Sequence, residues 1–268
     1  MIDSQDGSIF AGRSTLFSAI RNDIIEALMD TEIIHTDRWQ QLDISQSAAH
    51  GTHELLNVSI WYDMPEFADE AQRYMKPDLP WAEAHFQERV GGKPINPGVE
   101  HANWPHHAGE DQLHLKGGKY DHNYMERMWA SKLQSEIGDK RTFHGYRFRV
   151  GDLGDVVEQL RRDPTTRQAF LPIWFPEDTG AIARQRVPCS LGYHFIIREG
   201  KLHMSYYLRS CEIYRHFTND LYMAVRLAQW VRQKIEAGLS YLMGQLTVHI
   251  VSLHAFVGDT PKIWKELT

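Results

Sequence analysis

A cysteine and an arginine twenty residues apart could form a nucleophilic site. Cys189 follows a proline in Pro188-Cys189-Ser190, and Arg209 begins Arg209-Ser210-Cys211-Glu212. Apolar residues alternate on both sides of Glu199-Gly200, which predicts a β-hairpin with its bend there. A hairpin returns its far end to its start, so the thiol and the guanidinium would lie side by side. The guanidinium could then lower the pKa of the thiol or hold an anion beside it. The alternative is a small buried cysteine beside a surface arginine.

The elements that must position these residues follow from periodicity and composition. Apolar residues recur at helical spacing from Thr15 to Met29 and from Leu153 to Leu160, so we expect a helix in each segment. A strand is expected from Trp39 to Ile44. Residues 65–110 are rich in Pro, Gly, Trp and His and predict an ordered loop system with short helices. Such a region either closes over a ligand or is a structural insertion.

Bulk properties indicate a single enzyme domain over residues 1–268, since 42% hydrophobic content can bury one sizeable core. The net charge of −6 gives no general attraction to a nucleic acid polymer, so any phosphate site must be a local cluster. Two cysteines form no disulfide framework and favour a reducing compartment, the cytoplasm. Met1 to Gly12 contains acidic residues and no continuous apolar run, and the chain nowhere reaches the ~18 apolar residues that a membrane span needs, so neither export nor membrane insertion is expected.

From Asp37 to Phe256 the chain resembles the thymidylate synthase superfamily, most strongly from Asp163 to Asp220. In that family a Pro-Cys nucleophile is followed one hairpin later by Arg-Ser-x-Asp, and an Asn eleven residues past the Arg reads uracil. This chain has the Pro-Cys and Arg-Ser elements but places Asp220 at the base-reading position. An Asp there, in Phe217-Thr218-Asn219-Asp220, resembles the dCMP/CMP 5-hydroxymethylase branch. The resemblance implies an α/β (α+β) three-layer fold, with flanking helices and a large mixed sheet that forms a dimer interface.

The exchange of Asn for Asp has a chemical meaning. An amide both donates and accepts, which suits uracil O4 and N3–H, whereas a carboxylate accepts from the N4 amine of cytosine and, when protonated, donates to N3. Asp220 also precedes apolar residues at helical spacing, so it is equally suited to cap a helix N-terminus, and both roles can hold together.

The resemblance also implies a phosphate and sugar site. Arg38 follows Asp37 as in the family's phosphate loop, although a strand-edge arginine in a surface salt bridge is the alternative. Arg167 matches one of two family arginines that reach across a two-fold dimer, and Gln168 replaces the other. A homodimer with Arg167 contributed in trans is therefore expected. The substrate-binding set is completed by Arg209, Ser210 and His254, where His254 would hold the sugar and Phe256 replaces a family tyrosine.

Catalytic and cofactor positions follow from shorter matches. Glu83, three residues before Phe86, is the general acid/base candidate; the alternatives are Glu88 or a pair of exposed helix carboxylates. Tyr124 would join the proton-transfer network, unless it is only a half-buried aromatic with a satisfied hydroxyl. The cofactor-side residues are Trp129 and Glu212. For His101, His106 and His107 we expect a solvated cluster and no metal, because no matching Cys or carboxylate spacing accompanies them.

These residues together predict a transferase acting on a pyrimidine mononucleotide. The Cys189 thiolate would add to C6, C5 would take the one-carbon unit of 5,10-methylenetetrahydrofolate, and water would complete 5-hydroxymethylation of dCMP or CMP. The segment Ile263-Trp264-Lys265 lacks the apolar closing tail of a synthase, which fits the entry of water. The alternatives are a C5 methylase of dUMP or UMP and a nucleotide-binding homologue without turnover. Phe256 leaves ribose and deoxyribose open.

Overall fold

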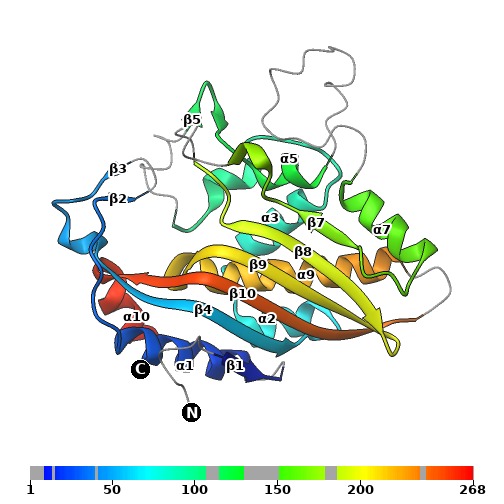
Figure 1. The fold of residues 1–268 in the computed structure, drawn as a ribbon, viewed down its shortest axis with the longest axis horizontal. Coiled ribbons are helices and arrows are strands. Elements are labelled where there is room, and N and C mark those ends of the chain that lie inside the picture. Colours follow the sequence, from blue (N-terminus) through cyan, green and yellow to red (C-terminus); the bar gives the residue numbers. More distant parts are fainter. Residues whose placement is uncertain are drawn as a thin grey trace.

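A six-stranded mixed sheet forms the centre of the protein, with its strands in the order β1-β4-β10-β9-β8-β7 (Figure 1). The structure is a computed structural model that describes residues 9–13, 16–39, 42–106, 115–129, 151–178, 186–235 and 240–267. The strands are β1 (Ile9–Gly12), β4 (Thr52–Asp63), β7 (Phe170–Pro172), β8 (Ser190–Arg198), β9 (Lys201–Glu212) and β10 (Leu242–Phe256). β10 runs parallel to β9 and antiparallel to β4, which makes the sheet mixed. The predicted α/β class with a large mixed sheet is confirmed.

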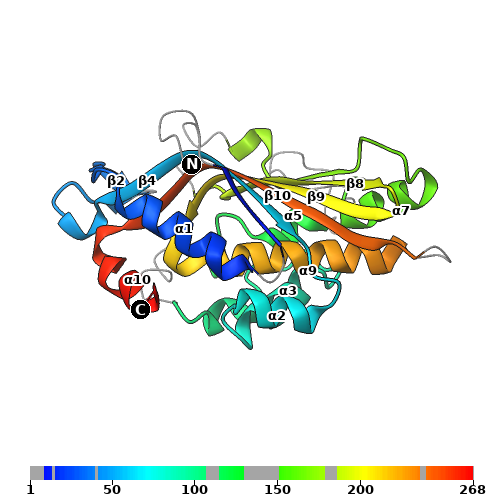
Figure 2. The same ribbon diagram turned by 90° about the horizontal axis from the view of Figure 1, so that it is seen from below.

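The helices that shape the core lie on one face of this sheet (Figure 2). The helix α9 runs along that face beneath β9 and β10, and α1, α2 and α3 lie beside or below it. The α-helices are α1 (Phe17–Met29), α2 (Ala68–Met75), α3 (Trp81–Arg89), α5 (Tyr124–Met128), α7 (Leu153–Arg162), α9 (Thr218–Ile235) and α10 (Thr260–Leu267). Shorter elements are the turns η2 (Ala48–His50), η3 (Val99–Asn103), η4 (Pro176–Asp178), η5 (Ile213–Phe217) and η6 (Val257–Asp259), and the strands β2 (Arg38–Trp39), β3 (Leu42–Asp43), β5 (Leu115–Lys116) and β6 (Lys119–Tyr120).

The predicted β-hairpin is confirmed as β8 and β9, which pair antiparallel. Glu199 and Gly200 form its bend with φ values of +50° and +71°, the left-handed backbone that a two-residue hairpin turn requires. Gly192 on β8 allows the close approach of β7, because a Cβ there would stand 2.8 Å from the carbonyl oxygen of Leu171. The hairpin thus has the geometry to bring residue 189 back to residue 209.

Two helix predictions are confirmed and two local predictions are wrong. The first helix begins at Phe17, and the Leu153 helix is capped by Asp152, whose carboxylate accepts from the Asp155 amide. The expected single strand Trp39–Ile44 is instead the short hairpin β2–β3, because Trp39 packs edge-on against Phe256 and the chain pairs back on itself. Asp220 does not cap α9, because that helix continues directly from η5 and begins at Thr218.

Within the described ranges, no helix combines the length and the apolarity needed to span a membrane. The single domain over 1–268 stays a prediction. The residues 65–110 contain α2, α3 and η3, which are short helices joined by ordered loops.

A buried ion pair fastens α5 to the segment after β7. Arg127, with a side chain 1% exposed, donates to both carboxylate oxygens of Asp178, one at 2.8 Å, and to the carbonyl oxygen of Ile173 at 2.8 Å. Removing one partner of such a pair leaves an uncompensated charge in the interior, which costs more than the pair itself contributes.

We therefore expect Asp178→Ala to lower the free energy of unfolding by about 3–5 kcal/mol, measured by urea denaturation. The matched control is Glu158→Ala, whose ion pair with Arg162 is largely exposed and should change stability by less than about 0.5 kcal/mol. Equal effects of the two substitutions would contradict this account of the Arg127–Asp178 pair.

Candidate active site

A cavity of about 250 Å³ opens where β8 begins and β9 ends. Three segments supply most of its wall: the face of α3 that carries Trp81, His85 and Arg89, the loop that leads into α5, and the first turn of α9. Its lining includes Trp81, His85, Arg89, His122, Tyr124, Arg186, Cys189, Ser210, Glu212 and Asp220. The cavity therefore brings together Cys189, Tyr124, Asp220, Ser210 and Glu212 from the sequence prediction.

Cys189 and Arg209 lie side by side, as the hairpin predicts. The Arg209 backbone N–H donates to the Cys189 carbonyl at 2.9 Å, and its Nη2 lies 3.9 Å from Sγ. The same guanidinium donates to the carbonyl oxygens of Pro188 at 2.9 Å and Val187 at 3.1 Å. Arg209 thus holds the strand entry that carries the thiol.

The thiol is not activated in the way the spacing predicts. Burial raises the pKa of Cys189 above its ordinary value, and the positive charges of Arg209 and Arg186 oppose this without overcoming it. The negative charge of Asp220 raises it further. Arg209 therefore lowers the pKa of the thiol as expected, but the pKa stays above its ordinary value because desolvation outweighs the cation.

Asp220 presents its carboxyl to the same cavity from the first turn of α9. Burial raises the pKa of Asp220 to about 6, and the nearby charge of Arg89 opposes the rise. Its neighbour Asn219 has a structural role instead: the Asn219 amide donates to the Asp78 carboxylate at 2.9 Å and accepts from the Asp78 backbone N–H at 3.0 Å. Of the two adjacent polar residues, Asp220 is the one with an ionisable group near neutral pH.

Tyr124 belongs to a hydroxyl network that reaches the residue after the cysteine. Ser190 Oγ donates to Tyr124 Oη at 3.1 Å and shares a hydrogen bond of 2.6 Å with Tyr206 Oη. Tyr206 stacks on Tyr193 with ring centroids 4.5 Å apart. Burial raises the pKa of Tyr124 above its ordinary value, so its hydroxyl stays protonated and uncharged near neutral pH.

Glu212 lies in the wall of the cavity but its carboxylate serves the backbone. It accepts from the N–H groups of Tyr214 at 2.9 Å and Arg215 at 2.7 Å, and so caps η5. Burial raises the pKa of Glu212 to about 7. The end of β9 is therefore joined to the turn that leads into α9.

Glu83 and Trp129 point away from the cavity. Glu83 accepts from Tyr222 Oη at 2.5 Å and from two nitrogens of Arg226 at 2.9 Å each, all on α9. The reason is helical phase, because Glu83 lies two residues after Trp81 and hence on the opposite face of α3. Trp129 donates from Nε1 to the Arg89 carbonyl at 2.7 Å and packs against Trp230. The structure brings neither residue to the thiol.

The predicted phosphate and sugar residues are dispersed in one chain. Arg38 is exposed on β2. Arg167 is exposed near the bend of the β8–β9 hairpin, where its backbone carbonyl oxygen lies 2.9 Å from Nε2 of His194. The bend is separated from Cys189 by the nine residues of β8, a strand length of about 30 Å. His254 lies on β10 opposite Glu212 in the strand register, outside the cavity wall. Any contact of Arg167 with a ligand at Cys189 must therefore come from another copy of the chain.

Comparison with known proteins identifies the family. The family model described as thymidylate synthase matches residues 51–266. The chain belongs to the thymidylate synthase family. A protein of Methanosarcina barkeri named "Putative thymidylate synthase" is 29% identical over 44% of this chain and 51% of its own length. One of Methanothermobacter thermautotrophicus with the same name is 32% identical over 55% of this chain and 70% of its own. The match thus spans about half the length of the first of these relatives.

A solved structure shares the fold. The thermostable thymidylate synthase A from Bacillus subtilis superposes with a TM-score of 0.63 over 95% of this chain and 84% of its own, at 18% identity. This likeness concerns the backbone alone. The family membership agrees with the sequence prediction, and the hydroxymethylase branch within it stays a prediction.

Sequence reasoning missed several residues that line the cavity. Trp81 stacks on His85 with centroids 5.3 Å apart, and Trp104 stacks on His216 at 5.0 Å, which gives the cavity an aromatic wall. Arg89 completes the stripe with Trp81 and His85. Their spacing of four residues along one helix face is a signal that was present in the sequence.

No group of three or more His, Cys, Asp or Glu side chains that could hold a metal ion occurs in the part of the chain that the structure describes. His107, one of the three histidines considered from the sequence, lies outside that part.

The two cysteines should differ sharply toward alkylation. Both residues line the cavity, but Cys189 is partly exposed, whereas Cys211 is 3% exposed and burial raises the pKa of its thiol well above the ordinary value. We expect iodoacetamide to label Cys189 alone, at a rate that keeps rising above pH ~8.5, the ordinary thiol value. Arg209→Met should slow labelling at pH 8. Peptide mass spectrometry measures both, and a rate that levels off below pH 7 would show that the thiol pKa is lowered after all.

Proposed function

We propose that the protein is a hydroxymethyltransferase that modifies C5 of a cytosine mononucleotide, CMP or dCMP, with the one-carbon unit of 5,10-methylenetetrahydrofolate. The observation that carries this proposal is the position of Asp220, whose carboxyl shares the cavity with Cys189. A carboxyl with a pKa of about 6 can accept from the N4 amine of cytosine, a hydrogen bond that uracil cannot make with it.

The chemistry assigned to Cys189 follows from the weak nucleophilicity of pyrimidine C5. Addition of the thiolate to C6 moves electron density onto C5, which then forms the bond to the transferred carbon. Loss of the C5 proton and elimination of the folate amine leave an exocyclic methylene on the ring. Water adds to that carbon and the thiolate leaves C6, so the product carries a hydroxymethyl group. Because burial raises the pKa of the thiol, a bound nucleotide and a base must assist its deprotonation.

We assign the proton-transfer role first expected for Glu83 to Tyr124, which lines the cavity, and to the Ser190 and Tyr206 hydroxyls linked to it. Glu83 is held by Arg226 and Tyr222, whereas Tyr124 is bonded to Ser190, the residue after the nucleophile. We assign to Tyr124, Ser190 and Tyr206 the ordering of the water and the proton at C5. These hydroxyls stay neutral and can both donate and accept.

The surroundings of the cavity fit an extended folate. Its flat pteridine would stack on the wall formed by Trp81 and Trp104. A second cavity of about 430 Å³ shares the Asn219 wall and is lined by Lys76 and Tyr74, so that the Lys76 ammonium is available to a glutamate carboxylate of the tail, whereas Arg21 in the same wall pairs with Glu266. Glu212, expected on the cofactor side, borders the first cavity, and Trp129 does not.

Methylation of uracil at C5 is the second candidate function. The names of the relatives favour it, and an ionised Asp220 could also accept from uracil N3–H. The two candidates differ in base and in product, which makes them separable in one experiment.

That experiment is incubation of the protein with methylenetetrahydrofolate and, in turn, CMP, dCMP, UMP and dUMP. We expect a hydroxymethylated cytosine nucleotide, identified by mass spectrometry of the nucleotide, and loss of product in Cys189→Ala. A methylated uracil nucleotide would establish the second candidate instead. Product formation that survives Cys189→Ala, or no product from any of the four, would leave a nucleotide-binding homologue without this turnover.

Replacing Asp220 by Asn should change both base preference and stability. The pKa of Asp220 is raised from 3.8 to about 6, so its ionised form destabilises the folded state above pH 6, and this cost disappears as pH falls toward 4. Asp220→Asn should therefore be more stable than the wild type by on the order of 1–2 kcal/mol at pH 8 and equal to it near pH 4. It should also bind UMP better than CMP. Thermal melting across this pH range and nucleotide titration provide the two measurements, and a variant that melts below the wild type at pH 8 would refute the assignment.

The sheet supports a homodimer in which Arg167 acts in trans. The face of the sheet opposite the helices exposes large apolar side chains, including Trp61 at 44%, Val251 at 51% and Phe170 at 41%. A second copy covering this face would bury them and could carry its Arg167 to the distant Cys189. With Arg209 and Ser210, that arginine would make a site for a phosphate dianion. Localisation in the cytoplasm, favoured by two free cysteines, stays a prediction.

Mixing two inactive variants tests this arrangement. Cys189→Ala lacks the nucleophile and Arg167→Glu would lack the charge delivered to the partner, yet a mixed dimer contains one intact site. After subunit exchange by mild denaturation we expect about a quarter of the wild-type activity, because half of the dimers are mixed and each has one working site. Activity that never exceeds that of the separate variants would exclude the contribution in trans.

A further inference from the structure

Arg89 is a buried cation in the wall of the cavity, and its two terminal nitrogens make no hydrogen bond to the described residues. Its residue is 5% exposed, and it lines the cavity that holds Cys189 and Asp220. Only Nε has a polar partner: it lies 3.2 Å from Nε2 of His85. The guanidinium carbon stands 4.2 Å from the centroid of the Tyr124 ring. Among the residues that the structure describes, neither terminal nitrogen has a hydrogen-bond acceptor. A buried charge in that state is costly, which indicates that a ligand supplies the acceptor.

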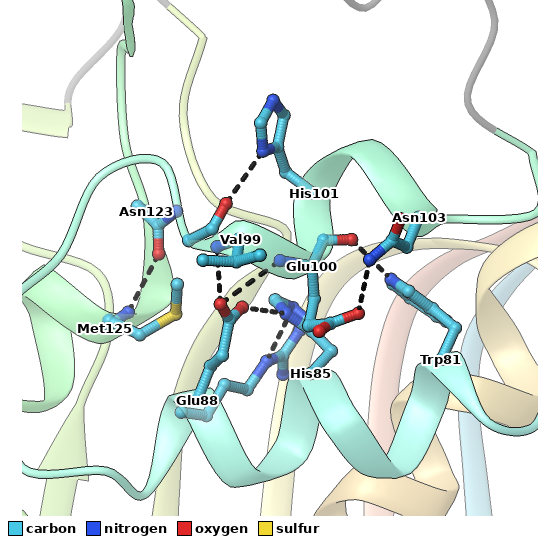
Figure 3. A network of polar contacts seen from close by, with 11 residues as sticks. Trp81, His85, Glu88, Val99, Glu100, His101, Asn103, Asn123 and Met125 are labelled. Atoms are coloured by element: carbon cyan, nitrogen blue, oxygen red, sulfur yellow. Dashed lines mark hydrogen bonds and ion pairs between the residues drawn. The ribbon is translucent and has the colours of Figure 1, made fainter.

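His85 is the polar partner of Arg89 Nε, and its ring also lies beside the Glu88 carboxylate (Figure 3). Arg89 Nε can only donate, so His85 Nε2 must accept, and the ring hydrogen therefore sits on Nδ1, 3.4 Å from the Glu88 carboxylate. Burial and the neighbouring charge of Arg89 lower the pKa of His85 to about 4, so the ring stays neutral and keeps its acceptor.

Glu88 is in turn fixed by the turn η3. Its other carboxylate oxygen accepts from the backbone N–H of Val99 and, at 3.1 Å, from that of Glu100 (Figure 3). The chain from η3 through Glu88 and His85 ends at the Arg89 guanidinium. This arrangement explains Glu88, the alternative to Glu83 in the sequence prediction, as a residue that positions Arg89 through His85.

The cavity thus contains an acceptor, Asp220, and a donor, Arg89, in the same wall lining. Arg89 is the cation that opposes the raised pKa of Asp220, and Arg186 also lines the cavity. Cytosine offers a complementary edge, with the N4 amine as donor beside N3 as acceptor, whereas uracil offers the reverse. We propose that Arg89 is the second base-reading residue, which donates to cytosine N3 while Asp220 accepts from the N4 amine. This inference rests on the proposed function, since it concerns how the cytosine nucleotide is recognised.

The proposal differs from one in which Asp220 alone reads both atoms. For that, the carboxyl must be protonated to donate to N3, and the preference for an N3 acceptor would fade as the pH rises above 6. A donor on Arg89 keeps its proton throughout the range in which the protein is handled. Arg89 from α3 is the charged group that acts on Asp220. The charge of Asp220 in turn raises the pKa values of the titratable groups that face it, which are Tyr124 from α5, Cys189 and Tyr193 from β8 and its entry, and Tyr206 and Cys211 from β9.

The test compares CMP with 3-deaza-CMP, in which C–H replaces N3 and only that acceptor is lost. Isothermal titration of the wild-type protein should show CMP binding at least about tenfold more tightly, the effect of one hydrogen bond from a charged donor, and the ratio should be constant from pH 6 to 8.5. Arg89→Met should bring the ratio close to one. The exposed-surface control Arg162→Met, at 78% side-chain exposure, should leave it unchanged.

Because Arg89 is buried, a second variant guards against misfolding of the first. His85→Phe keeps the arginine but removes the acceptor for its Nε, and should lower the ratio of CMP to 3-deaza-CMP affinity. Arg89→Lys, which keeps a positive charge, should retain part of this ratio. A ratio that survives Arg89→Met and His85→Phe, or that falls as the pH rises above 6, would overturn the role of Arg89. Equal binding of CMP and 3-deaza-CMP by the wild type overturns this inference alone, whereas absence of any binding of cytosine nucleotides overturns the proposed function with it.

Discussion

The antiparallel pairing of β8 with β9 is the constraint on which the site depends. At the cavity, this pairing ends with the hydrogen bond from the Arg209 backbone N–H to the Cys189 carbonyl oxygen. At the other end, the bend at Glu199 and Gly200, with its positive φ values, sets the register. The end of β9 then places Glu212, which caps η5 and so leads the chain into α9. One hairpin therefore fixes the thiol, the arginine beside it and, through the capped turn, the carboxyl of Asp220. A slip of one residue would turn Cys189 and its neighbours to the opposite face of the sheet.

Electrostatics in the cavity balance burial against a few fixed cations. Burial raises the pKa values of Cys189, Asp220 and Glu212. Arg209 and Arg186 oppose this rise at Cys189, and Arg89 opposes it at Asp220. A protein of net charge −6 thus gathers several arginines around one pocket. Such a local cluster suits a nucleotide monophosphate and gives no general attraction to a polyanion. Because the pKa of the Cys189 thiol is raised, its reactivity depends on how a bound ligand changes the charge and solvation around the sulfur.

Much of this arrangement could be predicted from sequence because it is local. The hairpin follows from alternation on both sides of a Glu-Gly bend, and the position of Asp220 follows from its distance to Arg209. Glu83 was misplaced for a physical reason: the phase of a short helix is set by its neighbours, and here Arg226 on α9 draws the carboxylate to the far side. The spacing of His85 and Arg89 places both on one face of α3, but their orientation depends on η3 through Glu88, a contact that no periodicity encodes. Arg167 shows the same limit, since its expected role would require a second copy of the chain.

The central claim is that Cys189 forms a covalent bond to C6 of a cytosine nucleotide during transfer of one carbon to C5. It is tested most directly with 5-fluoro-CMP or 5-fluoro-dCMP and methylenetetrahydrofolate, because fluorine at C5 cannot leave as a proton would and the reaction stops with the enzyme attached. Intact-mass spectrometry should show a protein heavier by one nucleotide and one folate, with the added mass on the peptide that contains Cys189 and absent in Cys189→Ala. An unmodified protein, or an adduct formed only with the fluorinated uracil nucleotides, would contradict the account.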